Sequence, residues 1–336
     1  MTEKIASESA PQPIRWGILG PGFIAGLFAT DLRAAGLNIQ AVASRRLAQA
    51  EEFAAEFGVP TAYGSYEELM ADAEVDVVYV ATPHPFHAEH ALLAIAAGKH
   101  VLIEKPFTLN AREAMRVAAA AAEADVVVLE AMWTRFLPHM RRIREIIAAG
   151  TLGEIRTVIA DHNQLLSKDP LHRINNPALG GGALLDLGIY PVSFAVDMLG
   201  LPTSITATAS MTETGVDRQI ALILTHDDGR QSVLQAALDT LGPNRAFVLG
   251  THGRIEIEPV WYCQAAFTVY DSDNNVVERF DDRLESRGMQ AQAIELERVI
   301  REELAESELM PVAETIAIMS ILDEARSQIG LRYPGE

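Results

Sequence analysis

The chain has 336 residues, of which 49% are hydrophobic and 22% charged, and 46 acidic residues against 27 lysines and arginines give a formal net charge of −19. This length predicts roughly two domains, each able to bury a core without disulfides or metals. A strongly acidic surface repels phosphate backbones and anionic lipids, so we expect neither nucleic acid nor a membrane as a partner. Any anionic ligand must therefore be held by a local group of positive charges.

Cysteine usage and the start of the chain indicate a reducing compartment. Cys263 is the single cysteine, so an intrachain disulfide is impossible. Residues 1–13 are polar and lack the apolar core of a secretory signal, so we interpret them as a flexible lead-in. No uninterrupted apolar run reaches the roughly 18 residues of a membrane span. We therefore expect a soluble, cytoplasmic protein.

The first part of the chain alternates short β-branched runs with alanine-rich amphipathic segments. The pattern predicts strands at 14–20, 38–44, 76–82, 100–105 and 126–132, and helices at 26–35, 47–57, 87–97 and 110–124. Asn110 and Glu113 predict a capping box at the start of the last of these helices. Continuously apolar strands between amphipathic helices indicate a parallel sheet covered on both faces. We therefore predict an α/β, doubly wound Rossmann domain over residues 14–131.

The pattern changes after residue 132. A basic amphipathic helix at 137–149 precedes longer predicted strands at 155–163, 203–213, 218–226, 231–239, 245–250, 254–260 and 266–271. Helices are predicted at 183–199, 289–303 and 312–329. Turn sequences between several of the strands favour hairpins. Residues 132–336 are thus predicted to form an α/β domain with a large, mostly antiparallel open sheet.

A glycine turn follows the first predicted strand. Gly20 permits the tight turn, and Gly22 lets the backbone approach a pyrophosphate. The helix start at Phe23 and Ile24 offers free N–H groups and a partial positive charge to that anion. The alternative is a glycine turn without a ligand. The strand–turn–helix position favours dinucleotide binding.

The second predicted strand ends at Ser44, Arg45 and Arg46. Sites for NAD usually carry an acidic residue there to bind the ribose 2′-hydroxyl, whereas a neutral residue followed by arginine suits a 2′-phosphate. We therefore predict NADP as the cofactor, with NAD as the alternative. The competing interpretation is two solvated arginines at a helix start.

Polar groups also follow the third and fourth predicted strands, where open α/β sheets gather their functional side chains. Thr82, Pro83, His84 and His87 follow one strand, and Glu104 and Lys105 end the next. A lysine at a buried strand end is unusual, because burial disfavours its charge. The alternatives are a surface lysine and ordinary loop histidines.

Asp186 and Tyr190 lie on the helix predicted at 183–199, just after three glycines at 180–182. Residues four apart share one helix face. A carboxylate and a phenol within an apolar helix need polar partners, which a lysine and a substrate hydroxyl would supply. The alternative is a helix cap and a core tyrosine.

These motifs together resemble the glucose–fructose oxidoreductase and inositol dehydrogenase (Gfo/Idh/MocA) family, in order, from about residue 14 to residue 332. The motifs are the glycine turn, Thr-Pro-His-Pro-Phe-His at 82–87, Glu-Lys-Pro at 104–106 and Gly-Gly-Gly-Ala-Leu-Leu-Asp-Leu-Gly-Ile-Tyr at 180–190. The stretches 130–138 and 213–217 resemble its dimeric dihydrodiol dehydrogenase branch, which includes NADP-dependent D-xylose 1-dehydrogenases.

The resemblance implies roles for particular residues. Lys105, Asp186 and Tyr190 would form the catalytic set, and Pro106 would follow a cis peptide bond. The glycine turn, residues 44–46, the 82–87 loop, Glu104 and Lys105 would bind the cofactor. Trp133, Arg135, Asp186 and Tyr190 would contact the substrate. The exposed face of the second sheet would pair subunits into a homodimer.

The predicted reaction is hydride transfer between NADP and a secondary alcohol or carbonyl of a sugar or cyclic trans-diol. Either Tyr190 or Lys105 is the immediate proton acceptor, and both alternatives are open because coupled groups titrate as a set. No histidine has a metal-ligand spacing, so we expect no metal. Two other functions compete: reduction of a ketosugar of the 1,5-anhydrofructose type, and a non-catalytic NADP-binding regulator.

Overall fold

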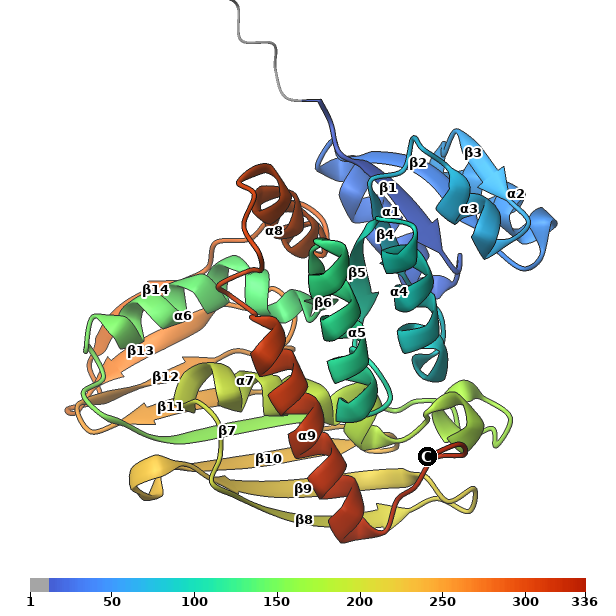
Figure 1. The fold of residues 1–336 in the computed structure, drawn as a ribbon. Helices are drawn as coiled ribbons and strands as arrows, with labels where there is room; N and C mark the ends of the chain where they lie inside the picture. Colours follow the sequence, from blue (N-terminus) through green and yellow to red (C-terminus); the bar gives the residue numbers. More distant parts are fainter. Residues whose placement is uncertain (1–11) are drawn as a thin grey trace, which may run out of the picture.

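The computed structural model describes residues 12–336, so nearly all of the predicted lead-in at 1–13 lies outside the described residues. Two sheets dominate the molecule, with helices around the first and between the two (Figure 1). The first sheet has six strands and the second has eight. This is the predicted pair of α/β domains.

The first sheet is parallel throughout, with strand order β3-β2-β1-β4-β5-β6. Its strands are β1 (Arg15–Leu19), β2 (Asn38–Ala43), β3 (Thr61–Tyr63), β4 (Val77–Val80), β5 (His100–Glu104) and β6 (Val128–Ala131). Its helices are α1 (Phe23–Ala34), α2 (Leu47–Phe57), α3 (Tyr66–Ala71), α4 (His87–Ala96) and α5 (Ala111–Ala124). The doubly wound prediction is confirmed. The crevice of such a sheet lies where the order reverses, at the carboxyl ends of β1 and β4.

Three details of this domain differ from the prediction. β3 and α3 were not predicted, because β3 has three half-buried residues and α3 has six, too few for a clear period. Asn110 caps α5 by accepting a hydrogen bond from the Glu113 N–H at 3.0 Å. The Glu113 carboxylate accepts from the Leu109 N–H and not from Asn110, so the predicted capping box is incomplete.

The second sheet has the strand order β14-β13-β12-β11-β7-β10-β9-β8. The strands are β7 (Ile155–Asn163), β8 (Ser204–Met211), β9 (Asp217–Thr225), β10 (Gln231–Ala237), β11 (Ala246–Gly250), β12 (Gly253–Ile257), β13 (Phe267–Asp271) and β14 (Val276–Phe280). Among the described strands of this second sheet, only the β7–β10 pair is parallel, which confirms the mostly antiparallel sheet. The edge strand β14 was not predicted, because none of its residues is buried.

The helix predicted at 183–199 is divided. A π-helical turn at Leu184–Gly188 precedes α7 (Ile189–Leu199). Such wide turns interrupt helices mainly at functional sites, and this one carries Asp186. The stretch Pro177–Leu199 is long and apolar enough to cross a membrane, but 94% of its most apolar window is buried inside the protein. It therefore packs as a core segment between the two sheets.

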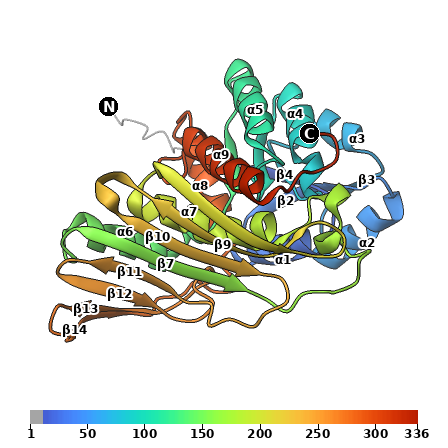
Figure 2. The same cartoon turned by 90° about the horizontal axis from the view of Figure 1, so that it is seen from below.

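The remaining helices join the two parts of the chain. They are α6 (Pro138–Ala148), α8 (Gln290–Arg301) and α9 (Val312–Ile329). The Trp16 indole on β1 donates to the Glu297 carboxylate of α8 at 2.9 Å, and the Ala111 N–H of α5 donates to Asp323 of α9 at 2.9 Å. α9 also covers β8, on the side of the second sheet that faces the first (Figure 2). The C-terminal helices thus fix one sheet against the other.

Candidate active site

A pocket of about 500 Å³ lies at the carboxyl ends of β1, β2 and β4. Gly20 has a φ of +92°, which favours glycine, and a side chain there would press on Thr82 and the Ala81 carbonyl. A Cβ at Gly22 would meet nothing within 4 Å, so the backbone there is open to a ligand. The lining residues are Gly20, Pro21, Gly22, Ser44, Arg45, Arg46, Gln49, Tyr66, Ala81, Thr82 and Pro83.

The charges of this pocket fit the phosphate groups of a dinucleotide. Its lining contains two arginines and no acidic residue. Arg45 and Arg46 form no ion pair within residues 12–336. The first turn of α1, at Phe23 and Ile24, leaves its N–H groups free beside Gly22. Gln49 and Tyr66 were missed, because α3 was not predicted and Gln49 follows the strand end by a full helical turn.

Three residues predicted to bind the cofactor have other partners. His87 is fully buried, and both of its ring nitrogens face backbone carbonyls. The Glu104 carboxylate accepts from the Tyr79 hydroxyl and, at 3.2 Å, from the Lys105 N–H. His84 lies against Asp186, with 3.6 Å between its Nε2 and Oδ1. These partners occupy the side chains of His87 and Glu104, and His84 lies with the candidate catalytic group.

Lys105 follows β5, and its side chain reaches the π-helical turn of the second domain. Its Nζ donates to the Asp186 carbonyl at 2.8 Å and lies 3.6 Å from the Asp186 carboxylate. The same Nζ is 5.2 Å from the centre of the Tyr190 ring. The Lys105–Pro106 peptide bond is cis, as the resemblance implies. Lys105, Asp186 and Tyr190 therefore meet across the interface between the two domains.

Asp186 is buried and faces three nitrogen-bearing side chains. Its Oδ1 is 3.1 Å from the Arg173 guanidinium, in addition to its contacts with Lys105 and His84. Burial acts to raise the pKa of Asp186, but Lys105, Arg173 and His84 together bring it well below its usual range. Burial lowers the pKa of His84 to about 3, so this ring is neutral near pH 7. Asp186 is thus an anion that balances Lys105. Arg173 was not predicted, because it lies in an irregular loop.

Tyr190 lies in the first turn of α7, just after the π-helical turn that carries Asp186. Its side chain is buried, and its hydroxyl oxygen accepts a hydrogen bond from the Trp133 indole at 3.1 Å. Burial raises the pKa of Tyr190 above its usual range, and the Glu104 charge raises it further, while the Trp133 N–H opposes both. The phenol is therefore protonated near pH 7 and held by a single donor. Trp133 lies beside the catalytic group, as expected.

Two further rings surround Tyr190 and were not predicted. His162 on β7 stacks on Tyr262 with 3.6 Å between ring centres and meets Tyr190 edge-on at 5.0 Å. Gln164 lies 2.8 Å from His162 Nε2 and positions that ring. Burial lowers the pKa of His162 to about 3. The inward alternation of Val158, Ala160 and His162 along the strand would have found this residue.

Arg135, predicted to contact substrate, has a structural role. Its guanidinium is buried and donates to the Ser193 hydroxyl and carbonyl, each at 2.9 Å. It also pairs with Asp197 and Glu314. These acceptors occupy its donors, and the side chain joins residues 133–136 to α7 and α9. A buried arginine needs such partners, but sequence spacing does not reveal them.

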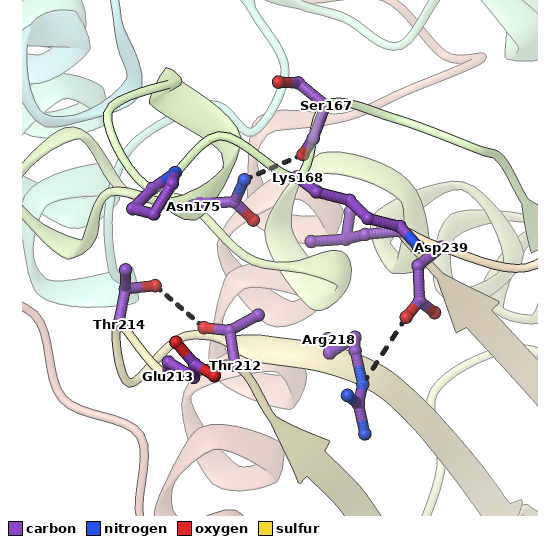
Figure 3. A pocket seen from close by; sticks show the side chains of 10 residues that line it. Ser167, Lys168, Asn175, Thr212, Glu213, Thr214, Arg218 and Asp239 are labelled. Carbon is purple, nitrogen blue, oxygen red and sulfur yellow. Dashed lines mark hydrogen bonds and ion pairs between the residues drawn. The ribbon is translucent and has the colours of Figure 1, made fainter.

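A second pocket, of about 310 Å³, lies between the loop after β7 and the β8–β9 hairpin. Figure 3 shows Ser167, Lys168 and Asn175 entering from the loop, and Arg218 facing Asp239 across the opposite wall. Its lining has two basic and two acidic residues, so it offers no excess of positive charge for a phosphate. None of the predicted site residues lines it.

The fold and the crevice together define a two-domain, nicotinamide-dependent oxidoreductase acting on CH–OH groups. The model of the oxidoreductase family with an NAD-binding Rossmann fold matches residues 14–132, and that of the GFO/IDH/MocA C-terminal domain matches residues 140–256. The chain belongs to this Gfo/Idh/MocA family, as its motifs indicated. Within residues 12–336 no three His, Cys, Asp or Glu side chains gather closely enough to hold a metal ion.

Several relatives are similar over nearly the whole chain. The trans-1,2-dihydrobenzene-1,2-diol dehydrogenase of Mus musculus is 38% identical over 331 residues, covering 96% of this chain and 98% of the relative. The same enzyme of Danio rerio is 37% identical, covering 95% and 98%. A 3-ketoreductase from Actinomadura kijaniata, solved with NADP and TDP-benzene, has a TM-score of 0.83 and 27% identity over 95% of this chain and 98% of that one.

Proposed function

We propose that this protein is an NADP-dependent dehydrogenase of secondary alcohols on sugars or cyclic trans-diols. The observation that carries the proposal is the meeting of Lys105, Asp186 and Tyr190 beside a dinucleotide pocket without acidic residues. The dihydrodiol dehydrogenases at 37–38% identity support the diol class. Nicotinamide, when bound, supplies the hydride chemistry.

The preference for NADP follows from the charges around the ribose position. An NAD site presents a carboxylate to the 2′-hydroxyl, whereas this pocket presents Ser44, Arg45 and Arg46. Arginine donors match phosphate oxygens in geometry and charge. The bound NADP of the similar 3-ketoreductase supports the same choice. The whole chain has a formal charge of −19, and Arg45 and Arg46 are the cations that line this pocket, so they are the charges that would meet a 2′-phosphate.

The protein's own contribution to the reaction is to hold the substrate and move one proton. For alcohol oxidation the Tyr190–Lys105 pair must first release one proton to solvent, which leaves a phenolate beside the ammonium or an amine beside the phenol. That deprotonated group would then accept the proton of the substrate hydroxyl as the alcohol is oxidised. The ammonium, 5.2 Å from the ring centre, favours the phenolate that a base requires. Asp186 holds the ammonium, and the Trp133 indole holds the phenol oxygen. The rings of His162 and Tyr262 form an apolar wall suited to a cyclic substrate.

The proposal is tested by NADP reduction with trans-1,2-dihydrobenzene-1,2-diol and D-xylose, and by NADPH oxidation with 1,5-anhydrofructose. We expect a kcat/KM for NADP above that for NAD, and an Arg45→Ala, Arg46→Ala double variant that loses most of this preference. A clear preference for NAD would remove the cofactor assignment. Binding of NADP without turnover of any substrate in either direction would favour the regulator.

A homodimer through the second sheet is part of the same proposal. One register line across the outer face joins Phe247 to Ile159, Ile159 to Val233, and Val233 to Ile223. Ile159, Val233 and Ile223 are 38%, 44% and 46% exposed, an apolar row suited to a second copy of the same face. Light scattering should give a dimer at micromolar concentration, and Ile223→Lys should give monomers. A wild-type monomer would overturn this part. A cytoplasmic location stays a prediction.

A further inference from the structure

Two buried titratable side chains grip one peptide group directly after the candidate catalytic lysine. The Pro106 carbonyl is 2.8 Å from His87 Nδ1, and the Phe107 N–H donates to Glu130 Oε1 at 2.9 Å. These two backbone atoms belong to the same peptide group. His87 begins α4 and is 0% exposed, and Glu130 lies on β6 and is 1% exposed. The proposed proton transfer uses neither side chain.

This peptide group is the first after Lys105 that can be held from both sides. Proline has no N–H, so the peptide group between Lys105 and Pro106 offers a carbonyl alone. The Lys105 N–H is already bonded to the neighbouring Glu104 carboxylate. The Pro106–Phe107 group offers a donor and an acceptor: its N–H is bonded to Glu130, and its carbonyl faces His87 Nδ1. A flexible lysine side chain, which carries about 2 kcal/mol of rotamer entropy, is thereby attached to a fixed backbone.

His87 also connects this loop to the dinucleotide pocket. Its Nε2 lies 2.7 Å from the carbonyl of Thr82, and Thr82 lines that pocket. A neutral imidazole donates from one nitrogen only. Burial lowers the pKa of His87 to about 4, so the ring is neutral near pH 7 and donates to one of the two carbonyls at a time.

We propose that His87 and Glu130 are positioning residues for Lys105, acting as a clamp on the Pro106–Phe107 peptide group. The clamp sets the direction in which the loop leaves β5, and so sets where the Lys105 ammonium meets Asp186 and Tyr190. This inference rests on the proposed function, because it assigns the clamp a purpose in that reaction. Misplacing a reacting group by about 1 Å can cost 10²-fold in rate.

Five variants separate the clamp from ordinary core packing. Glu130→Ala and His87→Ala remove it, and Glu130→Gln keeps an acceptor for the Phe107 N–H. His87→Asn puts a donor near Nδ1, toward Pro106, whereas His87→Gln puts one near Nε2, toward Thr82. The matched controls are Glu297→Ala, which removes the buried acceptor of the Trp16 indole, and His226→Ala, whose ring bonds the Gly200 carbonyl and the Ser232 hydroxyl.

The first measurement is steady-state kinetics with trans-1,2-dihydrobenzene-1,2-diol and NADP, together with the NADP dissociation constant. We expect both alanine variants to lower kcat by about 10- to 100-fold, with KM for the diol changed far less. Glu130→Gln and His87→Asn should recover most of the loss, and His87→Gln should not. The controls should lose stability but keep kcat. A wild-type kcat in both alanine variants, or equal kcat values for His87→Asn and His87→Gln, would overturn the proposal.

The second measurement does not depend on turnover. The sequence has four lysines, at positions 4, 99, 105 and 168, so trace acetylation followed by mass spectrometry reports Lys105 separately. Removing the clamp should raise the labelling rate of Lys105 relative to Lys168 several-fold, and Glu130→Gln should restore the wild-type ratio. An unchanged ratio in both alanine variants contradicts the clamp. If the wild type turns over no diol or sugar, the proposed function fails and this ratio alone decides the inference.

Discussion

The candidate active site is built from two segments that are held in different ways. Lys105 sits on a loop after β5, and Asp186 and Tyr190 sit on the π-helical turn and on α7. In each segment a buried carboxylate accepts a hydrogen bond from a main-chain N–H. Glu130 accepts from Phe107 at 2.9 Å, and Asp217 accepts from Leu184 at 2.6 Å. Burial raises the pKa of both carboxyls to about 7.

The difference lies in how much regular structure supports each segment. α7 repeats its own hydrogen bonds and is buried along nearly its whole length, so one anchor at Leu184, where the preceding π-helical turn begins, is enough to fix its direction. The loop after β5 has no such ladder, and buried side chains contact its Pro106–Phe107 peptide group at both the carbonyl and the N–H. More buried polar groups therefore hold the backbone where regular secondary structure is absent. The predictions below test the two segments against each other.

The largest expected effect comes from the reacting groups themselves. Lys105→Ala and Tyr190→Phe should each lower kcat by about 10²-fold or more, as loss of a general acid–base does. Because the two groups act as one unit across the interface, the double variant should be little worse than either single one. Steady-state kinetics of all three variants checks this. Multiplicative losses would mean that the segments act independently, and near-wild-type rates in both single variants would remove both roles.

Trp133→Phe should have a smaller effect, about 5-fold on kcat, because a typical lost hydrogen bond is worth about 1 kcal/mol. The indole N–H is the donor that holds the Tyr190 oxygen, and it lowers the pKa of that phenol. In the direction of alcohol oxidation the rate rises with pH as the phenol loses its proton, so the loss of this donor should move that rise to higher pH. Trp16→Phe is the matched control, since that indole donates to Glu297 away from the site. Identical pH profiles for wild type and Trp133→Phe would contradict this role.

Arg173→Gln should reduce kcat/KM by roughly 2- to 5-fold, because a half-exposed ion pair is worth at most about 1 kcal/mol. Arg173 helps to lower the pKa of Asp186, so its removal brings that pKa back toward the usual value. The acidic side of the kcat/KM profile should therefore move to higher pH. Arg283→Gln, which removes an exposed arginine paired with Asp281, is the control. An unshifted acidic limb would show that Lys105 alone sets the state of Asp186.

Asp217→Asn should change stability and not rate, and its effect is the smallest. The pKa of Asp217 is about 7 in the folded protein and near 3.8 when unfolded, so the folded state binds the proton more tightly. The stability contributed by this group is therefore complete below about pH 4 and is lost as pH rises through about 7. Asparagine keeps an acceptor for the Leu184 N–H and does not ionise. The melting temperature of the variant relative to wild type should rise by a few degrees between pH 5 and pH 8. Parallel curves would contradict the assignment.

Much of the fold followed from local patterns. The apolar runs of β1, β2, β4, β5 and β6 and the alternation of β7 to β13 were predicted with shifts of a few residues. Periodicity reports which side of an element is buried, and long elements repeat that signal. β3, α3 and β14 were missed because they are short or unburied. The π-helical turn was missed because the same apolar residues suit a continuous helix.

In the candidate site, too, local patterns predicted some features and not others. Local sequence patterns placed Gly20, Gly22, Lys105, Asp186 and Tyr190 where a strand ends or a helix begins, because backbone geometry and apolar period are local properties. The partners of these residues became known from the packing of the folded chain. Lys105 and Asp186 are 81 residues apart, and Trp133 and Tyr190 are 57 apart. The packing also brings Arg135 into contact with Ser193, and Arg173 into contact with Asp186. It places His87 and Glu130 against the backbone after Lys105. A buried polar group must have a hydrogen-bond partner. Which residue becomes that partner depends on how elements distant in the sequence pack together, and local residue spacing does not contain this information.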